Sequence, residues 1–293
     1  MRKDREAAGY HEVFGVELRR VTSILDRVKR FGLDEWQASC ALDYLIGEIL
    51  EPLRKEWMTV QQLKETDLEL TRKTAMGESR RIMKAKQGFG RRAHEVIHDY
   101  YKAGQDRNLI GGTIRMEPEL KLALMAFCKW EDEYDVQMTH AERLVFSFSK
   151  KYSGTLDLEA TVVLPNENAG DPPPRRLYIF DFKTGSPEPT QVMQLAAYVV
   201  AVEEMERRQV DGAGLVFLDP ATGRPRAKLF ERSDLYIPFM MFERLKGFVD
   251  LEDEWRHGHQ EFNGGPLEGQ PTTPPAGDGT PASPEPAGPP IFE

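Results

Sequence analysis

The chain has 293 residues, enough for one large domain or two small ones, and 39 basic against 48 acidic side chains give a formal net charge of −9. Its two cysteines, Cys40 and Cys128, stand apart, which argues against a disulfide framework, a cysteine-rich zinc site and a cysteine-ligated iron–sulfur cluster. No apolar run is long enough to span a membrane and the first residues lack the apolar core of a signal peptide, so we expect a cytoplasmic protein without a membrane partner.

The first 135 or so residues have apolar side chains at the three- and four-residue spacing of helices. We predict helices over residues 21–31, 34–53 (with Pro52 as a breaker), 60–101 (with Gly88 and Gly90 near its end) and 117–138. Residues 1–87 are therefore expected to form an N-terminal helical region.

Beyond residue 138 the apolar period changes from that of a helix to that of a strand. Short β-branched and aromatic runs predict strands at 142–154, 155–164, 176–185, 213–220 and 227–232, with helices at 190–208 and 237–255. The stretch NENAGDPPP between the second and third runs predicts a loop. Residues 88–257 are thus expected to form an α/β core.

The end of the chain has a different composition. Among the 36 residues from Gly258 to Glu293, 16 are proline or glycine, five are acidic and none is lysine or arginine. Such a segment buries too little apolar surface to offset its ordering entropy, so we predict a disordered tail over residues 258–293. Its tip, Pro289 to Glu293, resembles the partner-docking tips of single-strand-binding proteins, which suggests a recombination or single-strand-binding partner; the alternative is a tail that only keeps the protein in solution.

Four short features with chemical potential follow each other along the predicted core. They are GFGRRAHEVIHDYY with His94 on a helix, YSGTLDLEA with Asp157 in a strand, IFDFKTG with Asp181 and Lys183, and QVMQLAAY with Gln194 and Tyr198. Strand side chains alternate, so Asp181 and Lys183 share one face. Two carboxylates beside a lysine suit metal-assisted cleavage of a phosphodiester, with Mg²⁺ or Mn²⁺ as the ion that oxygen ligands prefer.

These features together resemble the PD-(D/E)XK nuclease superfamily, in its RecB-like and phage-exonuclease branch. The branch has a helix G-x-x-x-H, a strand G-x-x-D, a strand D-x-K-T-G and a helix Q-x-x-x-Y, and this chain has them in that order over roughly residues 20–200. The resemblance implies a restriction-endonuclease-like core, a central mixed sheet flanked by helices. It also implies a metal-dependent deoxyribonuclease, more an exonuclease than an endonuclease, working in phage-type recombination, DNA repair or end processing. The setting would be the cytoplasm of a bacterium or a phage-infected host cell.

Carried over by position, the resemblance assigns metal ligands and catalytic residues. Asp157, Asp181, the backbone carbonyl of Phe182 and His94 would hold Mg²⁺ or Mn²⁺, and Lys183 would be the catalytic lysine. Glu142 stands where some members place another catalytic acid, and Gln194 and Tyr198 would contact DNA or brace the site. The chain lacks the four cysteines of the cluster-bearing members and any P-loop helicase motif, so we expect a stand-alone nuclease.

Two other functions fit parts of the sequence. His94-Glu95-Val96-Ile97-His98 matches the H-E-x-x-H helix of zinc metallopeptidases, with Glu117 as a possible third ligand. That hypothesis leaves Asp157, Asp181 and Lys183 without a role. The third possibility is an inactive DNA-binding module on the same fold, against which the complete acid–acid–lysine set argues.

The stretch before His94 is strongly basic. Between residues 72 and 92 there are eight basic side chains and one acid, Glu78, which gives a local charge of +7. The basic residues there predict contacts with DNA phosphates, and the ones we assign to this role are Arg80, Arg81, Lys84, Lys86, Arg91 and Arg92.

Overall fold

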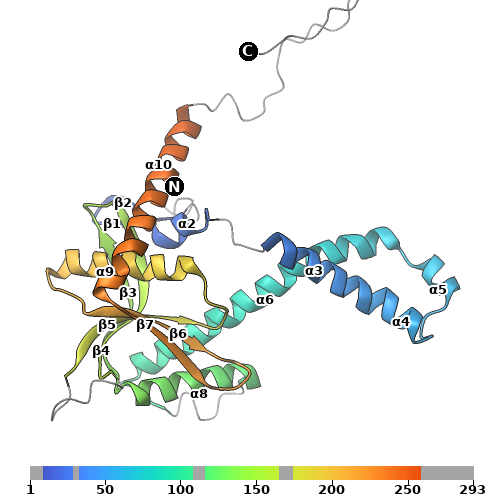
Figure 1. The fold of residues 1–293 in the computed structure, drawn as a ribbon, viewed down its shortest axis with the longest axis horizontal. Helices are drawn as coiled ribbons and strands as arrows, with labels where there is room; N and C mark the ends of the chain where they lie inside the picture. Colours follow the sequence, from blue (N-terminus) through green and yellow to red (C-terminus); the bar gives the residue numbers. More distant parts are fainter. Residues whose placement is uncertain (1–8, 29–32, 108–115, 165–173, 259–293) are drawn as a thin grey trace, which may run out of the picture. The chain divides into compact units, whose positions relative to one another are not determined.

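The computed structural model describes residues 9–28, 33–107, 116–164 and 174–258 (Figure 1). Residues Met1–Val249 form one compact unit and Asp250–Glu293 a second. The predicted tail, apart from its first residue, and most of the predicted loop at 166–174 lie outside the described residues. In the described part of the chain, no helix combines the length and the apolar character needed to cross a bilayer.

In the described chain a short hairpin is followed by a run of helices, then by three strands, a helix, two more strands and a closing helix. The strands are β1 (Tyr10–Val13), β2 (Val16–Arg20), β3 (Gln137–Ser147), β4 (Tyr152–Val162), β5 (Arg176–Lys183), β6 (Gly212–Leu218) and β7 (Pro225–Glu231). The helices are α2 (Val21–Leu25), α3 (Leu33–Leu45), the π-helix η1 (Ile46–Leu50), α4 (Glu51–Arg54), α5 (Val60–Glu65), α6 (Leu68–Lys102), α8 (Pro118–Glu133), α9 (Pro189–Glu206), the 3₁₀-helix η2 (Arg232–Leu235) and α10 (Tyr236–Gly258).

All seven strands belong to one sheet. Its order is β1-β2-β4-β5-β6-β7, and β3 pairs with β4 outside this path. The pairs β2–β4 and β5–β6 are parallel and the others antiparallel, so the sheet is mixed. Every residue of β6 is buried, as its unbroken apolar sequence predicts for a central strand covered on both faces. The predicted α/β class with a central mixed sheet is confirmed.

Strand β4 has one partner on one edge and two partial partners on the other. β3 pairs with it over residues 152–161. On the opposite edge β2 pairs only at 152–153, in parallel, and β5 pairs only over 158–162, antiparallel. β2 and β5 therefore run toward each other along this edge and both leave it before they meet. Residues 154–157 consequently have no strand partner on that edge.

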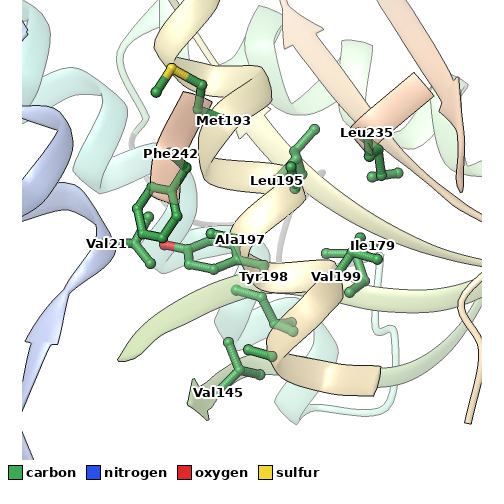
Figure 2. Close-up of a cluster of buried hydrophobic side chains, with 14 of the residues drawn as sticks. Val21, Val145, Ile179, Met193, Leu195, Ala197, Tyr198, Val199, Leu235 and Phe242 are labelled. Atoms are coloured by element: carbon green, nitrogen blue, oxygen red, sulfur yellow. The ribbon is translucent and has the colours of Figure 1, made fainter. Parts of the chain in front are cut away.

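Helices cover both faces of the sheet (Figure 1). On one face, α9 packs with α2 and the start of α10 in a buried apolar cluster, and Figure 2 draws side chains of this cluster from α9 beside Val145 of β3, Ile179 of β5 and Phe242 of α10. On the other face, α8 and the C-terminal part of α6 form a second cluster around Phe127, Trp130 and Phe182. The two faces are thus closed by different helices, as expected for an α/β layer structure.

Buried hydrogen bonds attach the end of α6 to α8. The carboxylate of Glu131, which is 4% exposed, accepts hydrogen bonds from the hydroxyl of Tyr100 and from Nε2 of Gln105 at 3.0 Å, and Arg107 pairs with it at 3.4 Å. These donors satisfy the carboxylate of Glu131, which would be costly to bury without hydrogen-bond partners. The part of α6 that carries His94 is therefore held firmly against the sheet.

The N-terminal hairpin adds two strands, which were not predicted, to a first region that was predicted to be mostly helical. Residues 10–20 form β1 and β2, joined by Phe14 and Gly15, whose φ angles are +49° and +79°. Two consecutive residues with positive φ make the kind of two-residue turn that matches the twist of a hairpin. The alternation of Glu12 and Val13 along β1 was too short to be separated from helical spacing by pattern alone.

Helix boundaries also differ from the predicted ones. α2 ends at Leu25 and does not continue to residue 31. Pro52 does not break the helical run but lies in the first turn of α4, where its missing N–H costs little. Gly88 and Gly90 lie inside α6, because packing outweighs a helix-propensity cost of about 1 kcal/mol for each glycine.

Candidate active site

A cavity of about 500 Å³ opens where β2 and β5 leave the edge of β4. The four predicted catalytic residues, Glu142, Asp157, Asp181 and Lys183, all line it. His94, Gln194 and Tyr198 line it as well. The cavity therefore gathers residues from α6, β3, β4, β5 and α9 that are distant in sequence.

The end of β5 supplies a buried acid and a lysine. Asp181 is 1% exposed, and Nζ of Lys183 lies 2.5 Å from its Oδ2. Beyond this ion pair, Oδ2 of Asp181 has no hydrogen-bond partner among the described residues. Burial, reinforced by the charge of Asp157, raises the pKa of Asp181 to about 6 although Lys183 opposes the rise. A buried carboxylate oxygen that is incompletely satisfied in this way suits a cation.

Lys183 keeps its proton in this environment. Burial alone would lower the pKa of its ammonium group, but the charges of Asp181 and Asp157 outweigh it and raise the pKa. The side chain is therefore a positive hydrogen-bond donor at neutral pH. It can orient water or stabilise negative charge, but it is not a base.

His94 connects β4 to the end of β5. Its Nε2 lies 2.9 Å from the carbonyl oxygen of Phe182, and its Nδ1 lies 3.4 Å from Oδ1 of Asp157. The charge of Asp157 raises the pKa of His94 to about 9, against the opposing effect of burial. Burial alone would raise the pKa of Asp157, but the charges of His94 and Lys183 and a hydrogen bond from the backbone of Phe182 lower it overall. In that hydrogen bond the N–H of Phe182 donates to Oδ2 of Asp157 at 2.7 Å. An imidazolium thus occupies the space between two oxygen ligands.

Glu142 faces Asp157 across the β3–β4 pair. The register aligns Ala141 with Leu158 and Arg143 with Leu156, so Glu142 and Asp157 fall opposite each other. Ligand atoms of His94, Glu142 and Asp157 all lie within 4.8 Å of one another. Burial and the charge of Asp157 raise the pKa of Glu142. These three residues could hold a divalent ion; Asp181, the other predicted ligand, lines the same cavity but does not belong to this group among the described residues.

The backbone of Glu142 is strained. Its φ is +48°, a left-handed conformation that is uncommon for residues with a Cβ atom. Strain of this kind costs of the order of 1–3 kcal/mol and persists where surrounding structure imposes it, often at functional sites.

We predict that Glu142→Gly and Glu142→Ala both lower metal affinity but differ in stability. Both remove the carboxylate, whereas only glycine relieves the strain at φ +48°. Glu142→Gly should therefore be more stable than Glu142→Ala by about 1 kcal/mol, measured by urea unfolding. Equal stability of the two variants would mean that the positive φ carries no strain, and unchanged metal affinity would remove Glu142 from the ligand set.

Two glycines allow elements to approach closely around the cavity. A Cβ atom on Gly154 would lie 2.4 Å from Cε1 of Tyr198, so only glycine lets this ring lie across β4. A Cβ atom on Gly90 would lie 3.3 Å from Oγ1 of Thr184, which brings α6 against the end of β5. Both glycines belong to the motifs noted in the sequence, and their role is close packing.

Gln194 and Tyr198 interact with each other. Nε2 of Gln194 donates a hydrogen bond to the hydroxyl of Tyr198 at 3.0 Å, and Tyr198 is 2% exposed. Burial strongly raises the pKa of this hydroxyl, so it stays protonated. Of the two roles predicted for this pair, bracing the site fits the buried position of Tyr198 better than contact with DNA.

The predicted DNA-contacting basic residues divide into two groups. The side chains farther from His94 are exposed on α6 and do not line the cavity; they are Arg80, Arg81, Lys84 and Lys86. Arg91 lines the cavity, and Arg92 pairs with Glu117 at 2.9 Å. The basic stretch is thus a solvent-exposed surface that leads along α6 to the cavity.

The metallopeptidase hypothesis gains no geometric support. His98 lines the cavity, but among the described residues it does not join His94 in a group of possible metal ligands. Glu117 is paired with Arg92, outside the cavity lining. Glu95 also lines the cavity, but its side chain is largely exposed, with Arg91 at 3.8 Å.

A second group of possible ligands lies elsewhere on the sheet. It consists of His140, Glu159 and Glu206. Arg143 and Arg208 both form ion pairs with the fully buried Glu159 and with Glu206. Two arginines already neutralise the two carboxylates, so this group is an ion-pair network and leaves little reason for a metal.

Sequence reasoning missed two residues of the cavity, Arg20 and Thr22. Both follow from the parallel pairing of β2 with β4, which joins residues more than a hundred positions apart. Two local signals were present: VTSIL at 21–25, which resembles a segment that often opens proteins of this branch, and the residues around Phe14 and Gly15, which indicate a hairpin but not its place in the sheet.

No protein-family model matches the chain, and no curated protein matches it.

Proposed function

We propose that this protein is a Mg²⁺- or Mn²⁺-dependent deoxyribonuclease of the RecB-like type, with a restriction-endonuclease-like core, acting as an exonuclease in recombination, repair or end processing. The observation that carries the proposal is the meeting of Asp157, Asp181, Lys183 and His94 in one cavity. The two carboxylates come from adjacent strands and the lysine shares the strand face of one of them. The arrangement agrees with the motif resemblance in the sequence.

The donor atoms in the cavity fit a hard divalent cation. Asp157, Asp181 and Glu142 offer oxygen and His94 offers nitrogen, which suits Mg²⁺ or Mn²⁺. The carbonyl of Phe182, the remaining predicted ligand, lies 2.9 Å from Nε2 of His94, and Phe182 is not among the residues that line the cavity. When bound, the ion would polarise the scissile phosphate and lower the pKa of a water molecule. His94 holds a proton at neutral pH without the ion, so its use as a ligand requires release of that proton.

The remaining residues have roles that follow from their charge and position. Lys183, as a protonated donor, would orient the attacking water or stabilise charge that develops on the phosphate. Tyr198 and Gln194 would hold the end of β5 and the floor of the cavity in place. The exposed basic side chains of α6 would neutralise phosphates of the approaching strand.

Cleavage of end-labelled DNA tests the proposal. Linear and covalently closed circular DNA should be incubated with the purified protein with Mg²⁺, with Mn²⁺ and with a chelator. We expect degradation of linear DNA only, and only with metal. Cleavage of circular DNA would make the protein an endonuclease, and no cleavage of either substrate would refute the nuclease proposal. Asp181→Asn protein purified in the same way controls for contaminating nucleases.

We predict that Glu95→Gln leaves DNA cleavage within about twofold of wild type. The Glu95 side chain is 63% exposed, and its Oε1 lies 3.8 Å from Nε of Arg91. We therefore expect it to have no part in holding the metal. As the base of a zinc peptidase, the same residue would be essential. Metal analysis and a peptide-hydrolysis assay on both proteins check the choice: stoichiometric zinc with hydrolysis that disappears in Glu95→Gln would favour the peptidase.

A further inference from the structure

The wall of the cavity opposite the end of β5 is formed by β2 and the start of α2. Arg20 is the last residue of β2, Thr22 follows in α2, and both line the cavity. Because β2 and β5 run head-on along one edge of β4, Arg20 and Lys183 stand at the ends of different strands, on either side of residues 154–157.

The guanidinium group of Arg20 has no carboxylate partner in the part of the chain that the structure describes. Within the described residues it forms no ion pair and no side-chain hydrogen bond; only its backbone N–H is engaged, with the carbonyl of Gly9. The other cations of the cavity differ, since Lys183 pairs with Asp181 and Arg91 lies 3.8 Å from Glu95. A half-buried guanidinium that is not paired with a carboxylate can bind an anionic ligand.

The charge of Arg20 reaches the interior of the cavity. Burial is the main cause of the raised pKa of Tyr198, and Arg20 is among the groups that oppose the rise. Tyr198 lies over Gly154 at the floor of the opening. Arg20 therefore acts on the same space as the acids, from the other side.

The catalytic groups and Arg20 reach the opening from its opposite ends. The β2 pairing on β4 ends at Ser153 and the β5 pairing begins at Leu158, roughly 17 Å further along β4 at about 3.3 Å per residue. β5 continues for three residues beyond Phe180, to Lys183, so the catalytic groups occupy part of this span and Arg20 lies at its other end.

We propose that Arg20, with the hydroxyl of Thr22 beside it, binds a phosphate of the nucleic-acid strand that neighbours the scissile phosphate. This inference rests on the proposed nuclease function and names a second phosphate subsite in the same cavity. The guanidinium fork would donate two hydrogen bonds to the phosphate oxygens, and Thr22 a third. The bound phosphate fixes the register of the strand relative to Asp157, Asp181 and Lys183.

The test combines an arginine variant with neutral phosphates. Binding of a short single-stranded oligonucleotide is measured with Mg²⁺ in an Asp181→Asn background, which prevents cleavage. A series of oligonucleotides carries one uncharged methylphosphonate at each position in turn, and further ones carry a phosphate or a hydroxyl at each end. Arg20→Gln is compared with Arg224→Gln, an exposed arginine outside the cavity that undergoes the same charge change.

We expect Arg20→Gln to weaken binding about tenfold or more, and Arg224→Gln by less than twofold. We expect one methylphosphonate position to weaken binding to the Asp181→Asn protein but not to weaken binding to the Asp181→Asn, Arg20→Gln protein any further. That position identifies the phosphate that Arg20 contacts. Coupling to an end phosphate would make the site a strand-end sensor, and coupling to an internal one a register clamp. Arg20→Lys should recover part of the affinity, because an ammonium lacks the fork.

Two results would overturn the inference alone. In both cases the wild-type protein still degrades DNA. The first result is an equal loss of affinity in Arg20→Gln and Arg224→Gln. The second is that the losses of affinity caused by Arg20→Gln and by a methylphosphonate add up at every position of the oligonucleotide. If wild-type protein neither binds nor cleaves DNA, the nuclease proposal fails and the subsite fails with it.

Discussion

Asp181→Asn should abolish DNA cleavage, with a loss of roughly a thousandfold or more in rate, and should sharply weaken binding of Mg²⁺ or Mn²⁺. Asparagine has nearly the shape of aspartate, so the packing of this 1% exposed side chain is kept while its charge is lost. The neutral amide cannot offset a divalent ion, and it leaves the ammonium group of Lys183 without its nearest anion.

Initial rates on end-labelled DNA and calorimetric metal titration check this prediction. Asp99→Asn is the matched control, because Asp99 is exposed on α6 and outside the cavity lining, and it should cleave within about twofold of wild type. Circular dichroism establishes that both variants are folded. Cleavage retained by Asp181→Asn at equal protein and metal concentrations would remove this residue from the site.

Lys183→Met should lose cleavage to a similar extent yet bind metal at least as well as wild type. The ammonium group lies 2.5 Å from Oδ2 of Asp181 and so competes with any cation for that oxygen. Methionine removes the competing charge and retains most of the side-chain volume. The titration should be done at about pH 8, since the pKa of Asp181 is already about 6 and rises further without its lysine partner.

The contrast between the two variants is what identifies their roles. Loss of both cleavage and metal binding in Asp181→Asn, with loss of cleavage alone in Lys183→Met, separates a ligand from a group that acts on the reacting atoms. Lys64→Met, on the exposed surface of α5, controls for the change of charge. Loss of metal binding in Lys183→Met would instead mean that the lysine serves to hold Asp181 in place.

Local sequence pattern predicted the parts of the site that one element carries. The alternation in β5 was enough to put Asp181 and Lys183 on one face, and the apolar run of β6 and the turn signals around it were enough to predict a strand. The helix that carries His94 and the helix that carries Tyr198 were also found, with boundaries a few residues off.

Features that depend on pairing between distant segments could not be predicted from local sequence pattern. The hairpin of residues 10–20 was missed because four or five alternating residues also fit a helical spacing. Its position beside β4, and with it the inclusion of Arg20 in the cavity, depends on a contact between β2 and Tyr152. The positive φ of Glu142 is likewise a product of the assembled β3–β4 pair and has no local signature.

The opening in the edge of β4 also bears on when a newly made chain becomes active. Both acids and the lysine have left the ribosome by the time residue 183 emerges, but β5 is then without its parallel partner β6, which ends at Leu218. Parallel pairings between distant segments form slowly, because a long loop must close before any contact rewards it. We therefore expect nascent chains to be incapable of cleavage until β6 has docked, so that activity arrives together with the completed sheet and not before it.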